Sequence, residues 1–260
     1  MWLVASCSFH VDAAENPDAT AAPSDVRDAP TCAPVLIDER FDNLDLATAG
    51  PLSTGAGFTA VTNASSGNGS SVEIAGGGLE IRTSNNATPQ APVHGVASIT
   101  SFAFNPAGMT VRLQVASADI PIWNGIALGI QSNQTTIDAA GGSLVLRIRG
   151  QGTNQFRVDM GNQNTYDPPL DLEPYDSTGL ADGFVVTWMV DASSWSYRVE
   201  GLLASGGPIT AGGGYRAGQT PADVLDATAH LGIHIQGNPN DTTPRVLRVD
   251  RLTLWDGVCQ

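Results

Sequence analysis

The chain contains no lysine: all 12 of its basic residues are arginine, and charged residues make up only 15% of its 260 positions. Against these 12 arginines stand 26 acidic residues, which give a formal net charge of −14 at pH 7. A surface of this sign repels the phosphates of nucleic acids and the anionic faces of membranes. We therefore expect no nucleic-acid partner, and we expect neutral or cationic partners or a divalent metal ion instead.

Long apolar runs are also missing from the chain. No stretch of 18 or more apolar residues occurs, so no segment has the length and character of a membrane-spanning helix. Glycine, by contrast, occurs 29 times. Low charge combined with abundant glycine is typical of all-β proteins with many turns. The length is sufficient for one large β-domain with a sizeable core, preceded by a tail.

Only three cysteines occur, and the first of them stands apart from the others. The residues Val4-Ala5-Ser6 before Cys7 resemble a bacterial lipobox, in which an aliphatic residue and two small residues precede a cysteine that becomes diacylated. Only six residues precede Cys7 and none is basic, so residues 1–7 resemble a truncated lipoprotein signal. The alternative is a cysteine that follows a short apolar start by chance. The first interpretation predicts an exported protein, anchored through Cys7 on the bacterial cell envelope.

Residues 8–31 have the composition of a tether. They consist mainly of Ala, Pro and Asp, with very few large apolar side chains. Such a segment buries too little apolar surface to offset the entropy lost on ordering, so we predict a disordered acidic tether. A single diacylated cysteine at its start would hold a domain at a membrane surface without a spanning helix.

The other two cysteines, Cys32 and Cys259, bracket the predicted domain of residues 32–260. In an exported protein such a remaining pair favours a disulfide bond, here between the first and the last part of the domain. Two unpaired thiols are the alternative. A zinc site is disfavoured, because no C-x-x-C spacing accompanies these cysteines.

Between these two cysteines the sequence breaks into short runs of alternating apolar residues, separated by Gly, Asn, Asp and Pro. A short helix is predicted only within 220–228. The number and spacing of the runs predict a two-sheet antiparallel sandwich. Strands are predicted at 35–41, 57–62, 71–75, 78–83, 94–104, 108–116, 124–131, 143–149, 154–160, 183–190, 194–201, 229–236 and 245–255.

Four motifs within these runs resemble those of the concanavalin A-like jelly rolls, which include LamG and family-16 glucanase domains. They are "IDERFDN", "GGGLEIRT", "FVVTWMVDASSWSYRVEG" and "RVDRLTLWDG", and the resemblance covers residues 35–257. It implies an all-β jelly roll that binds sugar on its concave face. It also implies a structural Ca²⁺ held by Asp250 and by a backbone carbonyl near Gly77, since calcium prefers such oxygen ligands. The alternative for Asp250 is an ion pair with a neighbouring arginine.

Strand alternation indicates which residues could form the binding face. If the apolar residues of the strands in 124–160 and 229–236 point inward, their polar residues share the opposite face. Planar amides and guanidinium groups suit sugar hydroxyls, because they offer paired donors at fixed angles. An aromatic platform is expected from Trp123 or from a tyrosine at 166, 175 or 215. The alternative is an ordinary solvent-facing sheet. The predicted glycan-binding residues are Gln131, Arg147, Arg149, Arg157, Asp159, His234, Gln236 and Trp123.

Catalytic motifs are not found. Family-16 catalysis needs two carboxylates that flank the bond, and the Glu-x-Asp-x-x-Glu pattern of that family does not occur here. Neither a G-x-S-x-G nor an H-E-x-x-H motif occurs. We therefore expect a non-catalytic glycan-binding module without a catalytic cofactor. The alternatives are a structural or protein-interaction protein of the envelope, and a divergent glycoside hydrolase or polysaccharide lyase. A lyase could use His234, Arg147 and a tyrosine, because it needs only a base and a group that neutralises charge.

The lipobox interpretation can be tested by metabolic labelling. Bacteria that express the protein in the presence of a radioactive fatty acid should label the wild-type chain and leave Cys7→Ser unlabelled, because the thiol is the acylated group. Equal labelling of both chains, or of neither, would contradict a lipid on Cys7.

Overall fold

The chain divides into two units, Met1–Pro30 and Thr31–Gln260. The computed structural model describes parts of the second unit only, namely residues 34–42, 45–46, 57–62, 71–83, 93–119, 125–134, 142–150, 155–162, 165–166, 170–174, 182–203, 206–215, 217–236 and 245–259. The predicted signal, the tether, Cys7 and Cys32 therefore lie outside the described residues. Among the described residues, no helix is long and apolar enough to cross a membrane.

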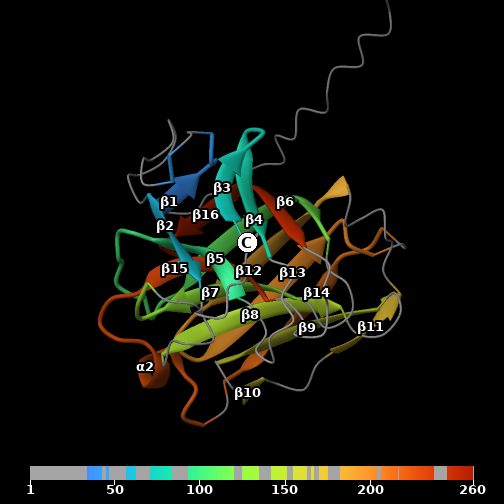
Figure 1. Cartoon of the computed structure of the whole chain (residues 1–260). Coiled ribbons are helices and arrows are strands. Elements are labelled where there is room, and N and C mark those ends of the chain that lie inside the picture. Colours follow the sequence, from blue (N-terminus) through green and yellow to red (C-terminus); the bar gives the residue numbers. More distant parts are fainter. Residues whose placement is uncertain are drawn as a thin grey trace, which may run out of the picture. The chain divides into compact units, whose positions relative to one another are not determined.

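Two antiparallel sheets form the second unit (Figure 1). We call the first sheet A; within it, β1 pairs with β16 beside the main path. Its strands in spatial order are β14 (Ile209–Gly214), β13 (Ser194–Glu200), β12 (Phe184–Val190), β6 (Met109–Ala118), β16 (Val246–Trp255), β4 (Gly78–Arg82) and β3 (Ser71–Ala75), with β1 (Val35–Glu39) at the side.

Sheet B is the second sheet, in which β11 pairs with β9 beside the main path. Its strands in spatial order are β10 (Thr165–Tyr166), β9 (Gln155–Asn162), β8 (Ser143–Gly150), β7 (Gly125–Gln131), β15 (His230–Gln236), β5 (Val93–Ser98) and β2 (Phe58–Thr62), with β11 (Leu170–Pro174) at the side. The helix α2 (Pro221–Val224) precedes β15, and Pro221 lies in its first turn, where the missing N–H costs no hydrogen bond.

Alternate residues of both sheets meet in one hydrophobic core. On sheet B, Ile126, Leu128 and Ile130 are at most 2% exposed, and on sheet A Trp188 and Val186 are equally buried. Burying one such aliphatic side chain contributes about 1.5–3 kcal/mol. The predicted inward direction of the apolar residues of β7 is confirmed, and Trp188 of β12 packs in the same core.

All thirteen predicted strands are present, with ends that move by a few residues. The largest change is at 94–104, where β5 ends at Ser98 and Phe102 forms an isolated bridge with Ala229. Three strands escaped the sequence prediction for different reasons. β14 contains three consecutive glycines, β10 has two residues, and β11 ends at a proline. Such residues weaken the periodic signal on which strand prediction depends.

Strand β16 contains an irregularity that positions Asp250. Its register against β6 shifts between Val249 and Arg251. Asp250 and Arg251 therefore both leave the core, although Val249 before them and Leu252 after them are fully buried. This two-against-one arrangement is that of a β-bulge, which re-aims side chains at a chosen point of a strand.

The C-terminal segment folds back onto sheet A. The N–H of Cys259 donates to Oγ1 of Thr110 at 2.9 Å, and the N–H of Asp256 donates to the carbonyl oxygen of Pro34 at 2.9 Å. Cys259 is 6% exposed, and its sulfur is disulfide-bonded. The partner lies outside the described residues, so the pairing with Cys32 stays a prediction; Pro34 stands only two residues after Cys32.

Removal of this disulfide should destabilise the domain. In the chain-entropy model a loop of this length contributes about 5 kcal/mol at most. Cys259→Ser should therefore lower the melting temperature measured by circular dichroism, as should a reducing agent on the wild-type protein. Cys7→Ser is the matched control and should melt like the wild type. A melting temperature that neither Cys259→Ser nor the reducing agent changes would exclude a stabilising bond.

Candidate functional site

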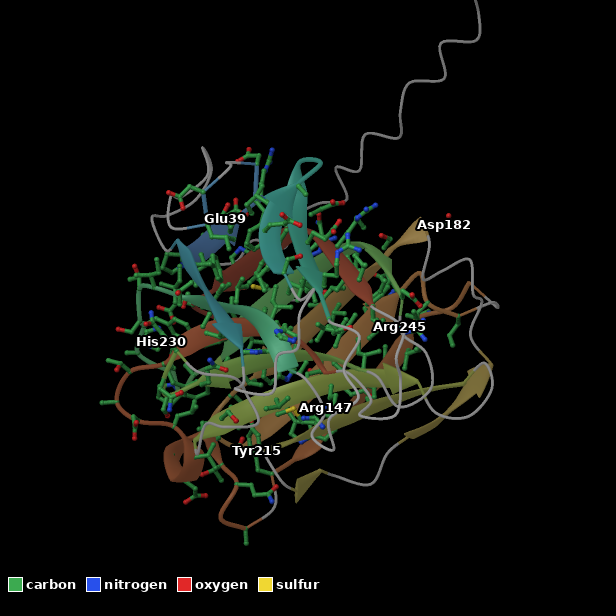
Figure 2. All side chains as sticks on the ribbon, in the orientation of Figure 1. Glu39, Arg147, Asp182, Tyr215, His230 and Arg245 are labelled. Atoms are coloured by element: carbon green, nitrogen blue, oxygen red, sulfur yellow. The ribbon has the colours of Figure 1, made fainter. Side chains whose placement is uncertain are left out.

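The predicted binding residues fall into adjacent rows on one face of sheet B, the side that points away from the core. We call it the polar face. In its central row, strand register aligns Asp159, Arg147, Ala127, His234 and Gly95 across β9, β8, β7, β15 and β5. Figure 2 labels Arg147, which comes from β8. Alternate residues of neighbouring strands thus bring together side chains that are far apart in the sequence.

The other predicted residues lie on both sides of the central row, and the row of Gly129 and Gly232 separates Gln131 from it. On one side, Arg157 of β9 is opposite Arg149 of β8, which is opposite Gly125 of β7, and Gly125 is opposite Gln236 of β15. Beyond the other side, Gln131 of β7 is opposite both Ser143 and His230. All seven strand residues of the predicted set therefore occupy register positions on one face. The side chains of Arg149, Arg157, Asp159 and Gln236 lie outside the described part of the structure, as does Trp123.

The centre of the polar face differs from the expected open surface, because its side chains are buried. Arg147 is 6% exposed, and Gln131 and His234 are fully buried. Ala127 and Val145 between them form a small buried cluster of their own. The alternation of the sequence therefore correctly indicates the side of the sheet, but the prediction of solvent exposure is wrong for these residues.

Small residues make up the middle of the polar face. Gly129, Gly232 and Ala97 form one row, and Ala127 and Gly95 continue it in the next. At Gly95 the backbone of β15 approaches so closely that a Cβ atom would lie 2.0 Å from the carbonyl oxygen of Ile233. Glycine is required there, since close approach of two backbones leaves no room for a side chain. Small residues therefore line the polar face across β7, β15 and β5, and Val145 of β8 continues the row of Gly129.

His234 is a neutral imidazole. Burial, assisted by the positive charge of Arg147, lowers its pKa to about 3. Neither ring nitrogen has a hydrogen-bond partner among the residues that the structure describes. A neutral imidazole offers one donor and one acceptor, so His234 contributes hydrogen bonding rather than charge at physiological pH.

Sequence reasoning missed one position of this face. Asp171 of β11 is opposite Arg157 of β9, and Asp159 is opposite Arg147. Each aspartate thus faces an arginine in register. The Leu-Asp-Leu alternation of residues 170–172 was the available signal, but Pro174 in the same segment hid it.

Asp250, the predicted metal ligand, lies beside the glycine turn as the resemblance implied. A Cβ atom on Gly78 would be 3.6 Å from Oδ1 of Asp250, and Gly77 takes the left-handed conformation with φ +82°. Desolvation raises the pKa of Asp250, although the residue as a whole is exposed. Its neighbours on the strand have other partners: Arg248 pairs with Glu80, and Arg251 with Asp38.

This arrangement fits a calcium ion in part. A carboxylate and the carbonyls of a glycine turn are ligands that Ca²⁺ accepts. The described residues contain no group of three or more His, Cys, Asp or Glu side chains that could hold a metal. An ion at Asp250 would therefore depend on backbone carbonyls and water for its other ligands.

The second unit also contains a cavity of about 240 Å³. It is lined mainly by apolar residues of α2 and its surroundings, among them Phe104, Pro221 and Leu225. Its lining contains none of the predicted site residues, so we do not assign the binding function to it.

A two-sheet sandwich with a polar outer face on one sheet defines a class of proteins, and comparison with known structures identifies that class. Lectin II from Ulex europaeus superimposes with a TM-score of 0.56 at 8% identity, over 86% of this chain and 100% of the lectin. Lectin I-B4 from Griffonia simplicifolia, in a metal-free form, gives 0.54 at 8% identity, over 76% and 92%. LamAcat from Zobellia galactanivorans gives 0.52 at 10% identity, over 86% and 98%.

The chain thus has the concanavalin A-like jelly-roll fold. No family model matches its sequence, and no curated protein matches it either. Identities of 8–10% establish the fold alone, since one fold serves many functions.

The calcium prediction has a direct test in thermal melting. Addition of CaCl₂ should raise the melting temperature and EDTA should reverse the effect, because an ion that binds only the folded state stabilises it by about 2.7 kcal/mol at 100 times its Kd. Asp250→Asn removes the charge at constant volume and should abolish the response. Glu73→Gln, on strand β3 of the same sheet, is the control and should keep it. A response that persists in Asp250→Asn would place the ion elsewhere.

Proposed function

We propose that the protein is a non-catalytic glycan-binding module, tethered to the cell envelope through Cys7, whose polar face binds the sugar. The observation that carries the proposal is the strand register, which gathers Arg147, His234 and Gln131 on a face lined by small residues. Lectin UEA-II, a protein with the same fold, is known in complex with galactose. That likeness supports a sugar as the ligand class but does not identify the sugar.

The chemistry of the face suits a neutral, hydroxyl-rich ligand. The guanidinium group of Arg147 offers several donors in a fixed plane, and the amide of Gln131 offers both donors and an acceptor. The low pKa of His234 adds a neutral hydrogen-bonding group. Glycine and alanine at this point of the sheet bring the side chains of His234 and Gln131 close to the backbone of β15, since a Cβ atom on Gly232 would lie 2.7 Å and 3.1 Å from them.

Binding to a glycan array should therefore depend on these side chains. The double variant Arg147→Ala/His234→Ala should lose binding, because a hydrogen bond to a charged group contributes about 1.5–3 kcal/mol, or roughly 10- to 150-fold in affinity. Arg198→Ala on sheet A, whose guanidinium pairs with Glu200 at 2.8 Å, should bind like the wild type.

Both polar residues are buried, so folding of the variants must be checked by circular dichroism. The single variant His234→Gln keeps a neutral polar side chain and provides a milder test. If the folded wild type binds no glycan on the array, the proposal fails. In that case a pull-down from the envelope fraction would test the alternative of a structural or protein-interaction role.

One observation favours a second candidate, a divergent glycoside hydrolase. Asp159 and Asp171 occupy neighbouring strands of the polar face, β9 and β11, and hydrolysis requires two carboxylates on either side of the scissile bond. Release of reducing sugar from a bound polysaccharide, lost in Asp159→Asn and in Asp171→Asn, would establish catalysis. Binding without any release would support the non-catalytic module.

A further inference from the structure

The cavity of about 240 Å³ has walls from three separate segments of the chain. One wall is the segment between β5 and β6, the second is the turn between β12 and β13, and the third is α2 with the residues that follow it (Figure 1). Phe104 and Leu225, both half-buried, supply its largest apolar side chains. A cavity of about 150 Å³ is enough for benzene, so this one has room for an aromatic ring with a short chain.

Backbone hydrogen bonds join the three walls to one another. The N–H of Ala192 donates to the carbonyl oxygen of Pro106 at 3.1 Å, which links the second wall to the first. Phe102 and Ala229 form a bridge with two hydrogen bonds, at 2.8 and 2.7 Å, which links the first wall to the segment after α2. Because these bonds are made within the protein itself, the cavity is formed before a ligand enters, as is usual for small-molecule sites.

The side chains of the lining offer a hydrogen-bond acceptor and no donor. Seven of the eight lining residues are Phe, Pro, Ala or Leu, whose side chains carry no polar atom, and the eighth is Asp226. The backbone N–H of Asp226 donates to Oγ of Ser132 at 2.9 Å, which ties the residue to the end of β7. Because an ionised carboxylate only accepts hydrogen bonds, the polar part of a matching ligand is a donor.

A second carboxylate stands directly before the lining residue Ala192. Burial works against the ionisation of Asp191, but hydrogen bonds from Ser194 and Ser193 outweigh it and lower the pKa of this aspartate. Neither Asp191 nor Asp226 forms an ion pair in the part of the chain that the structure describes. A positive charge on the ligand would therefore meet carboxylates that no cation neutralises, in a protein whose net charge is −14.

We propose that this cavity binds a small amphiphilic amine, whose apolar body fills the space between the three walls while its ammonium group faces the carboxylate of Asp226. An alcohol of the same shape would fill the apolar part without the attraction between charges. A carboxylate would be repelled by Asp226. The lining shares no residue with the predicted glycan-binding set, so the proposal does not rest on the function proposed above.

Three probes of similar shape test the proposal: phenethylammonium, phenethyl alcohol and phenylacetate. In NMR titrations of the wild type, phenethylammonium should shift the methyl signals of Ala192, Ala222 and Ala227, which line the cavity. Phenethyl alcohol should bind about three- to fivefold more weakly, the effect of an exposed ion pair, and phenylacetate should not bind. If no probe shifts these methyl signals, or if the alcohol binds as tightly as the amine, the proposal is overturned.

The charge is tested with Asp226→Asn, which keeps the volume of the side chain. This variant should bind phenethylammonium as weakly as phenethyl alcohol and leave the affinity for the alcohol unchanged. Glu73→Gln makes the same change in net charge at an exposed residue outside the lining, and it should bind like the wild type. Added NaCl should weaken the amine in the wild type but not in Asp226→Asn, because salt screens exposed charges. Equal affinity for the amine in Asp226→Asn and in the wild type would contradict the role of Asp226.

The cavity itself is tested with Ala222→Leu. Ala222 is an exposed residue of α2, and leucine is a good helix former, so the larger side chain should enter the cavity and weaken the amine and the alcohol to a similar degree. Ala75→Leu, at an exposed residue of β3 outside the lining, is the matched control. Unchanged binding in a folded Ala222→Leu would place the probes elsewhere and overturn the proposal. If circular dichroism shows that Ala222→Leu does not fold, the methyl shifts of the wild type decide the question.

Discussion

The register of β15 between β7 and β5 is the constraint on which the described site depends. Seven residues of this strand face partners on β7, and five of them also face partners on β5. Because side chains alternate with a period of two, a shift by one residue would turn His234 into the core and Ile233 out of it. The full burial of Leu231, Ile233 and Ile235 therefore stabilises the fold and at the same time fixes the side on which the imidazole emerges.

Glycine residues in turns provide unusual backbone conformations, whereas on sheet B they allow close approach of neighbouring groups. At Gly95 the backbone of β15 leaves no space for a Cβ atom, and at Gly232 a Cβ atom would contact the side chains of His234 and Gln131. Glycine within a strand weakens it, because it costs entropy and offers no side chain to pack. In the centre of the sheet, hydrogen bonds to neighbouring strands on both sides of β15 offset this loss. The absence of a side chain at Gly232 allows His234 and Gln131 to lie close to the backbone.

The sequence allowed a good prediction of the fold and a partial prediction of the site. Periodic apolar residues revealed thirteen strands, since packing against one core imposes that period. Strand alternation also placed Arg147, His234 and Gln131 on one face. It could not reveal their burial, because a period of two says which side of a sheet a residue takes and nothing of what covers it. Asp171 escaped because β11 is short and ends in proline. The convergence of His234 and Gln131 above Gly232 depends on distances between strands, which no local pattern encodes.

The place of β16 in sheet A has a consequence for the order of events in synthesis. This last strand lies between β6 and β4 and also pairs with β1, the first described strand. Sheet A therefore lacks the strand between β6 and β4 until almost the whole chain has been synthesised. Most of the pairings in this sheet join residues that are far apart in sequence. Such long-range pairing makes folding slow. Sheet A can therefore be completed only after β16 has been synthesised.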